Sequence, residues 1–260
     1  MIIPKNSKPK REYRELEYLY GDSKDIIQLS EEKLNKLKQL NKNKIDDECF
    51  QRIIDEIKNN KLKFKLSPQE NNYIKNINEA DILDYLIYRY KFTQYPKNKI
   101  NFDFPLYILI EAASSCNLRC AMCFQSDKSF RKKKYMGLMD PKLFKKVIDE
   151  AYEKGTKAVT FGSRGEPSIH PKIGEFLTYT KDKFLETKFI TNATKLNDNL
   201  IHSIFKSNVH MVNFSIDSED SKTYEKIRKY SEFENVLKNV KRYNEIKKEY
   251  KNCNYFYKKN

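Results

Sequence analysis

Three cysteines, separated by three and then by two residues, are the part of the sequence whose spacing most directly indicates chemistry. Cys116, Cys120 and Cys123 lie in the segment from Glu111 to Phe124, which follows the apolar run 106–110. A loop this short can turn its three sulfurs toward one small inorganic centre. A structural zinc or ferredoxin site closes itself with four protein ligands, so a set of three leaves one metal position free for a ligand that is not protein. The spacing therefore predicts a reactive metal centre.

The segment resembles the signature of the radical S-adenosylmethionine (radical SAM) superfamily, C-x-x-x-C-x-aromatic/apolar-C, with Met122 at the apolar position. In that family the three cysteines hold a [4Fe–4S] cluster, and S-adenosylmethionine (SAM) chelates the remaining iron through its amino and carboxylate groups. The resemblance implies that Cys116, Cys120 and Cys123 bind the cluster and that Met122 contacts the cofactor. It also implies cleavage of SAM to a 5′-deoxyadenosyl radical, which abstracts hydrogen from a substrate that the protein positions and shields from water.

A second motif follows the next predicted strand, residues 157–162. The sequence continues as Ser163-Arg-Gly-Glu-Pro167, and radical SAM proteins carry a similar G-G-E-P motif, in which a backbone carbonyl and the glutamate bind the ammonium of SAM. Gly165 and Glu166 match the motif. Arg164 replaces its first glycine, which keeps the cofactor contact and directs a guanidinium toward the substrate. Gly-Glu-Pro alone is a common turn, but its place after a strand downstream of the cysteines makes the resemblance specific.

The third predicted strand, residues 187–191, ends in Thr191, Asn192 and Ala193. Radical SAM proteins often have Thr-Asn-Gly at this place, facing the cofactor or the substrate, and Ala193 departs from the glycine. The resemblance implies a cofactor contact at Asn192 and a substrate-facing Thr191. The alternative is an ordinary polar turn between a strand and a loop.

The fourth predicted strand covers residues 211–217 and resembles the strand whose end contacts the ribose of SAM in the family. A serine hydroxyl or a carboxylate makes that contact, so the resemblance implies cofactor contacts at Ser215 and Asp217. Asp217 has an alternative role as the cap of the helix that follows.

The fold is predicted to be α/β. From about residue 105, short apolar runs alternate with amphipathic helices, which is the pattern of βα units and a parallel sheet. About four such units are visible, and residues from Asn254 open a fifth strand, so the resemblance implies an incomplete, partial (β/α) barrel of the radical SAM type. Helical spacing and a capping box, Ser67-Pro-Gln-Glu70, predict an α-helical region before it. The predicted boundaries are a loose basic arm (1–25), a helical accessory region (26–98) and the radical SAM core (99–260).

Composition limits the other classes of function. The 260 residues are 39% hydrophobic, which suffices for a core, and no apolar run approaches the length of a bilayer span. The start of the chain lacks a signal-peptide core, and an odd number of cysteines, five, argues against a disulfide framework, so a reducing, cytoplasmic location is predicted. The net charge of +15 permits binding to nucleic acid, but the lysines are spread along the chain and no nucleic-acid motif accompanies them.

The sequence therefore predicts a radical SAM enzyme with a [4Fe–4S] cluster and SAM as cofactors, an external electron donor, and a small-molecule, sugar or peptide substrate. Two alternatives stay open. One is a truncated, non-catalytic remnant that binds the cluster or cofactor and acts as an interaction module. The other is a basic zinc- and RNA-binding protein in which the three cysteines recruit one more ligand. Zinc predicts a colourless protein, whereas a cluster predicts a brown one.

Overall fold

The computed structural model describes residues 29–41, 45–59, 61, 64, 66–75, 77–250 and 256–259. The chain divides into two compact units, of which the first ends at Thr93 and the second begins at Gln94. The predicted basic arm, residues 1–25, lies outside the described residues. No helix in the described part of the chain combines the length and the apolar character needed to cross a membrane.

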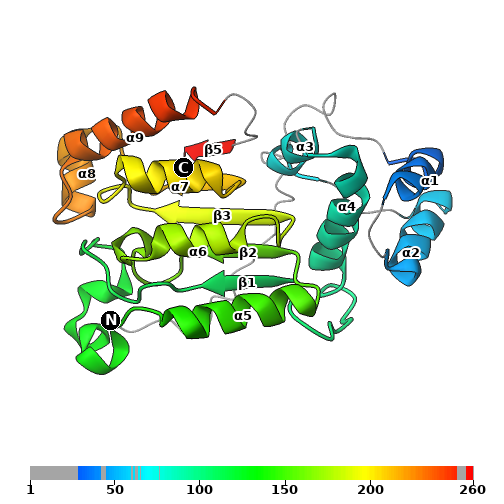
Figure 1. Cartoon of the computed structure of the whole chain (residues 1–260), viewed down its shortest axis with the longest axis horizontal. Helices are drawn as coiled ribbons and strands as arrows, with labels where there is room; N and C mark the ends of the chain where they lie inside the picture. The colour runs from blue at the N-terminus through cyan, green and yellow to red at the C-terminus, as the bar shows by residue number, and fades with distance from the viewer. Residues whose placement is uncertain are drawn as a thin grey trace, which may run out of the picture. The chain divides into compact units, whose positions relative to one another are not determined.

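The first unit is helical, and three of its helices begin at side chains that cap them. The helices are α1 (Glu31–Leu40), α2 (Asp47–Lys58), α3 (Pro68–Ile74) and α4 (Glu79–Gln94) (Figure 1). Ser30, Asp46 and Ser67 each accept a hydrogen bond from a backbone N–H of the first turn. Glu70 accepts from the Ser67 N–H and completes the predicted capping box. These contacts satisfy N–H groups that have no partner inside the helix.

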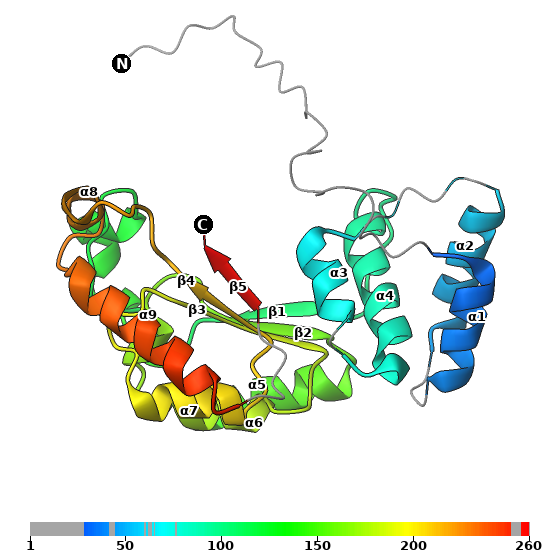
Figure 2. The same cartoon turned by 90° about the horizontal axis from the view of Figure 1, so that it is seen from above.

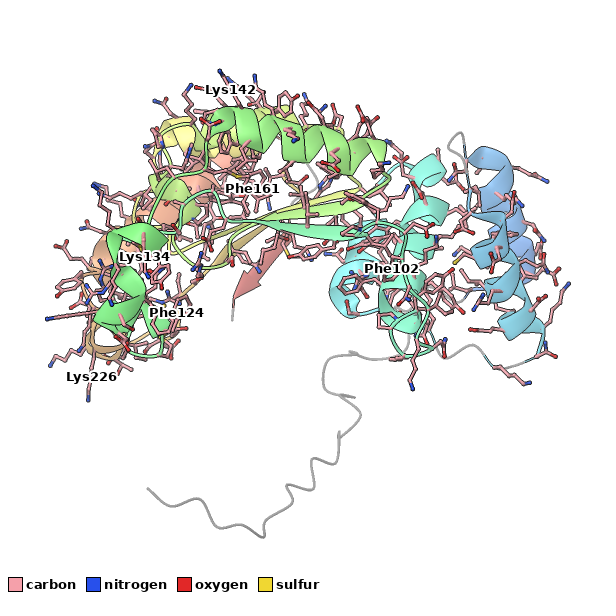
Figure 3. The ribbon with its side chains drawn as sticks, turned by 90° about the horizontal axis from the view of Figure 1, so that it is seen from below. Phe102, Phe124, Lys134, Lys142, Phe161 and Lys226 are labelled. Carbon is pink, nitrogen blue, oxygen red and sulfur yellow. The ribbon has the colours of Figure 1, made fainter. Side chains whose placement is uncertain are left out.

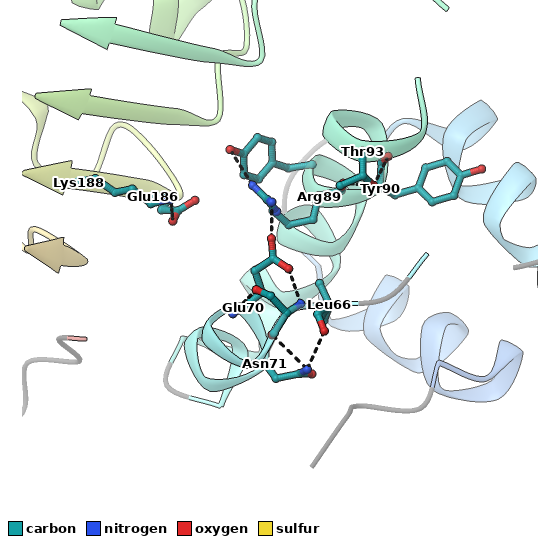
Figure 4. A network of polar contacts seen from close by, with 10 residues as sticks. Leu66, Glu70, Asn71, Arg89, Tyr90, Thr93, Glu186 and Lys188 are labelled. Carbon is teal, nitrogen blue, oxygen red and sulfur yellow. Dashed lines mark hydrogen bonds and ion pairs between the residues drawn. The ribbon is translucent and has the colours of Figure 1, made fainter. Parts of the chain in front are cut away.

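An ion pair joins α3 to α4 in this unit. Glu70 and Arg89 form it with side chains that are only 15% and 14% exposed (Figure 4). The Arg89 guanidinium also lies 4.9 Å from the ring centre of Phe92, within the range of a cation–π interaction. Because Glu70 caps α3 and pairs with Arg89, one carboxylate fixes both the start of α3 and its contact with α4.

The second unit contains a five-stranded parallel sheet with its strands in sequence order. The strands are β1 (Tyr107–Ile110), β2 (Ala158–Phe161), β3 (Glu186–Thr191), β4 (Met211–Phe214) and β5 (Phe256–Lys259). The predicted α/β class is therefore confirmed, including a fifth strand near the predicted position. The fourth strand ends at Phe214, so it is shorter than predicted, and Ser215 and Asp217 lie in the loop that follows it.

Helices connect the strands and cover one face of the sheet. They are α5 (Pro141–Glu153), α6 (Ile173–Thr180), α7 (Asp198–Lys206), α8 (Ser221–Ile227) and α9 (Phe233–Lys247). Figure 2 shows α5, α6, α7 and α9 on the same side of the sheet. Alternate strand residues, such as Val159, Phe161, Phe189 and Val212, belong to the apolar core on that side. Phe161 lies between the sheet and α5 (Figure 3), where its ring contacts Phe144.

A histidine at the amino-terminal edge of the sheet links β3 to β4. The ring Nδ1 of His210 accepts a hydrogen bond of 2.9 Å from the Thr187 N–H, and the His210 N–H donates to the Thr187 carbonyl. Burial lowers the pKa of His210 to about 4, an effect that the nearby Asp182 partly opposes. A protonated ring cannot accept the hydrogen bond, so the fold requires the neutral form.

We expect the protein to lose stability between pH 6.5 and pH 4 because of His210. In this window the unfolded histidine binds a proton and the folded one does not, so the free energy of unfolding falls as the pH falls, by about 3 kcal/mol in total. His210→Gln keeps an acceptor without a titrating group and should flatten this part of a denaturation-against-pH curve. His202→Gln in α7 is the control, and equal slopes for the wild type and the His210 variant would contradict the assignment.

Candidate active site

The predicted site residues all follow the carboxyl ends of the first four strands. The cysteine loop begins at Glu111 after β1, Glu166 follows β2, Asn192 follows β3 and Ser215 follows β4. Because the strands are parallel and neighbouring, their carboxyl ends lie at one edge of the sheet. The sheet therefore brings segments that are far apart in the sequence to a common site.

The cysteine loop is held by the segment that ends α8. The Arg119 N–H donates to the Lys229 carbonyl at 3.1 Å, and the Ala121 N–H donates to the Ile227 carbonyl at 2.7 Å. Cys120, between the two donors, is 9% exposed, and the other two cysteines are partly buried. Backbone hydrogen bonds to a distant segment therefore fix the shape of the loop that carries the thiols.

The three thiols have an environment that suits a cationic centre. Burial raises the pKa of Cys116 and of Cys120, and the nearby Glu166 and the other cysteines raise the pKa of Cys116 further. Arg228 opposes the effect at Cys120, where its guanidinium lies 3.8 Å from the sulfur. Three neighbouring thiols cannot all ionise easily unless a positive centre stabilises them, and a bound metal provides that charge.

The three thiols are soft donors of the kind that holds an iron–sulfur cluster. An iron–sulfur cluster spreads its cysteine ligands over several irons, so it needs the sulfurs to surround a larger volume. The donor set of Cys116, Cys120 and Cys123 fits such a cluster.

Gly165 lets the loop after β2 contact the cysteine loop directly. Its φ is +61°, a conformation that glycine adopts without strain. A Cβ atom at this position would lie 1.9 Å from the Ala113 carbonyl oxygen and 2.6 Å from that of Ser115. The next residue, Glu166, donates its N–H to the Ser115 carbonyl at 2.9 Å. Only a residue without a side chain permits this approach of the two backbones.

Glu166 is buried and accepts hydrogen bonds from two loops. Only 3% of the residue is exposed. One oxygen accepts from the Thr191 hydroxyl at 2.7 Å and from the Ser168 N–H at 3.0 Å, and the other accepts from the Asn192 N–H at 2.7 Å. The carboxylate therefore connects the loop after β2 to the end of β3.

These contacts leave Glu166 suited to one further cationic donor. A carboxylate has about four lone-pair positions, and three are used. All three donors are neutral groups, so within the described residues the negative charge is not balanced by a cation. A buried carboxylate in this state fits an ammonium group, such as that of SAM, which supplies both the missing donor and the missing charge.

Asn192 joins the end of β3 to the cysteine loop. Its side-chain N–H group donates to the side-chain oxygen of Asn117 at 3.1 Å and lies 3.9 Å from the Cys116 sulfur. Thr194 donates its N–H and its hydroxyl to the Asn192 side-chain oxygen. Ala193, between them, is fully buried with a φ of +61°, a conformation that favours the glycine usual in the family. The predicted cofactor contact at Asn192 stays a prediction, but the residue lies beside a predicted ligand.

Arg164 pairs with the first residue of the cysteine loop. Its guanidinium donates two hydrogen bonds of 2.8 Å to the two oxygens of Glu111. The pair is partly exposed, with side chains that are 46% and 23% accessible. This contact joins the end of β1 to the loop after β2. The role of Arg164 toward the substrate stays a prediction. The substrate-facing role of Thr191 also stays a prediction, and its hydroxyl donates a hydrogen bond to Glu166.

Three predicted cofactor residues occupy different environments. Met122 is 60% exposed, and Ser215 donates its N–H to the Thr191 carbonyl at 2.9 Å. Asp217 forms an ion pair of 2.6 Å with Arg228. The alternative role of Asp217 as a helix cap is wrong, because Asp220 caps α8.

Arg228 is a residue that the sequence analysis did not single out. It lies between Asp217 and Cys120, contacts both, and is 9% exposed. Its position after a short helix carries no motif, so only the packing of α8 against the cysteine loop identifies it.

Residues 124–135 form an exposed insert beside the cysteines. It consists of three short 3₁₀ helices, and Phe124 and Phe130 make an edge-to-face contact although each is almost half exposed. Figure 3 shows Phe124 and Lys134 at the end of the unit where Lys226 of α8 lies. The insert therefore combines aromatic and basic side chains at the rim of the site.

Comparison with known proteins agrees with this geometry. Residues 110–257 match the family model of the radical SAM superfamily. The chain belongs to the radical SAM superfamily. The match begins at the last residue of β1 and includes every predicted ligand and cofactor contact, so the resemblance stated from the motifs is confirmed, together with the partial barrel. Enzymes are among the relatives that match this chain.

Two curated proteins are similar to this chain over part of its length. The tungsten-containing aldehyde ferredoxin oxidoreductase cofactor-modifying protein of Pyrococcus furiosus is 34% identical over 112 residues, which are 43% of this chain and 30% of that protein. The GTP 3′,8-cyclase of Chlorobaculum tepidum is 28% identical over 137 residues, 52% of this chain and 40% of that protein. The chain thus spans less than half the length of these relatives.

Among solved structures, Streptococcus suis SuiB bound to its precursor peptide SuiA has a similar fold. The TM-score is 0.50 at 21% identity, and the match covers 85% of this chain and 48% of SuiB. At this identity the likeness concerns the fold of the radical SAM protein alone.

We expect Gly165→Ala to disrupt the site. The added Cβ cannot fit against the two carbonyl oxygens, so the cysteine loop must move, at a cost of at least about 3 kcal/mol in the free energy of unfolding. Gly155→Ala is the matched control, because Gly155 also has a positive φ (+85°) but has nothing within 4 Å of the Cβ position, which leaves only a backbone cost of about 1 kcal/mol.

Chemical denaturation gives both free energies, and iron content after anaerobic reconstitution reports on the loop. Equal destabilisation of the two variants, with equal iron, would show that the close approach at Gly165 is not required.

Proposed function

We propose that this chain is a radical SAM enzyme that holds a [4Fe–4S] cluster through Cys116, Cys120 and Cys123 and binds SAM at Glu166. The observation that carries the proposal is the buried Glu166 carboxylate, which has neutral donors on three lone pairs and lies against the cysteine loop. When bound, the cluster and SAM together supply a 5′-deoxyadenosyl radical for hydrogen abstraction.

The chain's own residues position and shield these groups. Glu166 binds the ammonium of the methionine part of SAM, and the Thr191 hydroxyl and the Asn192 N–H hold its carboxylate in place. Because Glu166 is 3% exposed, water competes little for this carboxylate. Ser215 and Asp217, in the loop after β4, are proposed contacts to the remainder of SAM, and Met122 is a proposed contact from the cysteine loop.

Arg228 has a supporting role at the cluster. Its guanidinium lies 3.8 Å from the Cys120 sulfur and is held by the Asp217 carboxylate. A hydrogen bond from a cation to a ligand sulfur favours the thiolate form that a metal requires. The insert 124–135 lies at the rim, where an external electron donor and the substrate have access.

The two parts of the chain have different proposed roles. We propose residues 99–260 as the radical SAM core and residues 26–98 as an accessory region.

The names of the similar proteins include two substrate classes. One relative is a GTP cyclase, and SuiB, which has a similar fold, is bound to a precursor peptide.

Anaerobic reconstitution with iron and sulfide tests the cluster. We expect a brown protein with about four irons per chain, and 5′-deoxyadenosine should form when dithionite and SAM are added. Cys120→Ala should lose both, because one of the three ligands is missing. Cys49→Ala, in α2 of the first unit, is the matched control and should keep the iron.

Each outcome separates the alternatives. Iron without 5′-deoxyadenosine favours a non-catalytic cluster-binding remnant. A colourless protein that takes up zinc through the same cysteines would refute the iron–sulfur assignment.

Glu166→Gln tests the SAM site. The substitution keeps the shape but removes the charge, and the amide N–H₂ group opposes one of the present donors, so we expect SAM to bind at least about tenfold more weakly. Equilibrium dialysis of the reconstituted protein with labelled SAM measures the change. Glu175→Gln, on α6, is the control. Unchanged affinity with normal iron content would exclude Glu166 as the ammonium ligand.

A further inference from the structure

An exposed surface beside the cysteine loop combines basic and aromatic side chains. It comprises the exposed side chains of the insert 124–135 and of residues 226–230, which end α8 and follow it, and is here called the basic aromatic surface. Figure 3 shows Phe124 and Lys134 of the insert at the same end of the unit as Lys226 of α8. Two segments that are far apart in the sequence therefore contribute to it.

Both segments are connected to the loop that carries the thiols. The insert follows Cys123 directly, and the Arg119 N–H donates to the Lys229 carbonyl at 3.1 Å. Ala121 and Met122, which lie between two of the proposed cluster ligands, are exposed. The proposed cluster is therefore close to solvent at the basic aromatic surface.

The charge of this surface is strongly positive. Asp127 is the only acidic residue of the insert. On α8, Glu225 is engaged, because one of its oxygens accepts a hydrogen bond of 3.0 Å from the Phe233 N–H. A positive surface of this kind favours an acidic partner and disfavours a second copy of this chain, which would bring like charges together. The lysines of the surface are all exposed: Lys128, Lys132, Lys133, Lys134, Lys226 and Lys229.

Large aromatic side chains are exposed among these lysines. Phe124 and Phe130 are 44% and 47% exposed and contact each other edge to face, and Tyr230 is 81% exposed. Exposed apolar side chains that are gathered in one region and bordered by charges are typical of a protein–protein interface.

Tyr230 is also in a backbone conformation that does not suit its side chain. Its φ is +73°, a left-handed conformation that is strained for a residue with a Cβ atom and that glycine adopts without strain. Because the residue is 81% exposed, little packing offsets this strain. A strained and exposed aromatic residue is expected where function, and not stability, determines the side chain.

We propose that the basic aromatic surface docks a small acidic electron-transfer protein of the ferredoxin type, which reduces the cluster. This inference rests on the proposed function and names the partner of that site. Electron transfer between proteins slows steeply with distance, so the donor has to dock where the cluster is closest to solvent. Complexes of this kind are small and transient, and their affinity depends more on charge complementarity than on buried area.

The electron balance of the step is simple. One electron leaves the [2Fe–2S]⁺ centre of the donor, which returns to [2Fe–2S]²⁺, and converts [4Fe–4S]²⁺ to [4Fe–4S]⁺ in this protein. No proton is transferred. The lysines attract and orient the acidic donor, and the aromatic side chains supply the apolar contact.

The test uses the reconstituted protein and, as the probe, an acidic [2Fe–2S] ferredoxin of the plant type, which has a low reduction potential. Anaerobic calorimetry measures its binding, and stopped-flow absorbance measures reduction of the cluster. We expect Lys132→Glu/Lys133→Glu to weaken ferredoxin binding by about tenfold, and Lys226→Glu by about threefold. Binding to the wild type should weaken by about fivefold or more between 50 and 300 mM salt.

Lys146→Glu/Lys206→Glu is the matched control, because these exposed lysines lie on α5 and α7 and the change in net charge equals that of the insert variant. It should keep the ferredoxin affinity of the wild type. An equal loss of affinity in the control would overturn the proposal, as would unchanged affinity in the insert and α8 variants.

Tyr230→Gly separates docking from folding. Glycine relieves the backbone strain, so the melting temperature should not fall, whereas ferredoxin binding should weaken by about fivefold because an exposed aromatic contact is lost. A lower melting temperature with unchanged ferredoxin binding would show that Tyr230 has a structural role only and would refute its part in docking.

The remaining outcomes distinguish the partner from the proposed function. Tighter binding of a uridine oligonucleotide than of ferredoxin would assign the surface to nucleic acid and overturn the proposal. A cluster that dithionite reduces but ferredoxin neither binds nor reduces would refute the docking and leave the proposed function intact. If the wild type takes up no iron, the proposed function fails, whereas calorimetry of the lysine variants with ferredoxin still decides the docking.

Discussion

The buried carboxylate of Glu166 is the group on which the arrangement of this site depends. A charge at 3% exposure is tolerated only where donors surround it, and here they come from the residues after β2 and from the end of β3. The Glu166 N–H also binds the Ser115 carbonyl of the cysteine loop. Glu166 therefore joins the segments at the carboxyl ends of β1, β2 and β3 at one edge of the sheet. Gly165 makes the arrangement possible, since any side chain there would separate the two backbones. The site is thus built from contacts of neighbouring loops around a single charge.

Much of this organisation can be predicted from local patterns in the sequence. The spacing of Cys116, Cys120 and Cys123 and the Gly165-Glu166 pair identify the family because each is a short segment with a fixed chemical task. Helix caps are equally local, as the Ser67–Glu70 box demonstrates. The parallel sheet follows from the alternation of strand and helix patterns, but the end of β4 was placed three residues too late. That error has a physical reason. Residues 215–217 continue the alternation of the strand but leave the ladder and enter a loop.

Tertiary relationships were not predictable. Arg228 reaches Cys120 and Asp217 only because the end of α8 packs on the cysteine loop, a contact between segments more than a hundred residues apart. Asp217 does not cap α8, because the helix begins at Ser221 and Asp220 occupies the N-cap position. The polar neighbours of β2 were also hidden, because the run Ala158-Val-Thr-Phe161 is typical of a strand buried on both sides. Only the register places Thr160 beside Lys188. A polar residue within an apolar strand can be interpreted only when its neighbours in the folded structure are known.

The hydrogen bonds from Arg119 and Ala121 to the residues that end α8 also have a consequence for the order of folding. Each strand of the sheet pairs with the next strand along the chain, 23 to 51 residues away, so these contacts close shorter loops than the contacts of Arg119 and Ala121 do. The cysteine loop, in contrast, is completed by residues 227–229, which a ribosome synthesises more than a hundred residues later. During synthesis the first three strands can therefore assemble while the thiols still lack their final backbone restraints. The backbone contacts that complete the thiol-bearing loop are accordingly a late event in folding, which requires that α8 has been synthesised and has docked.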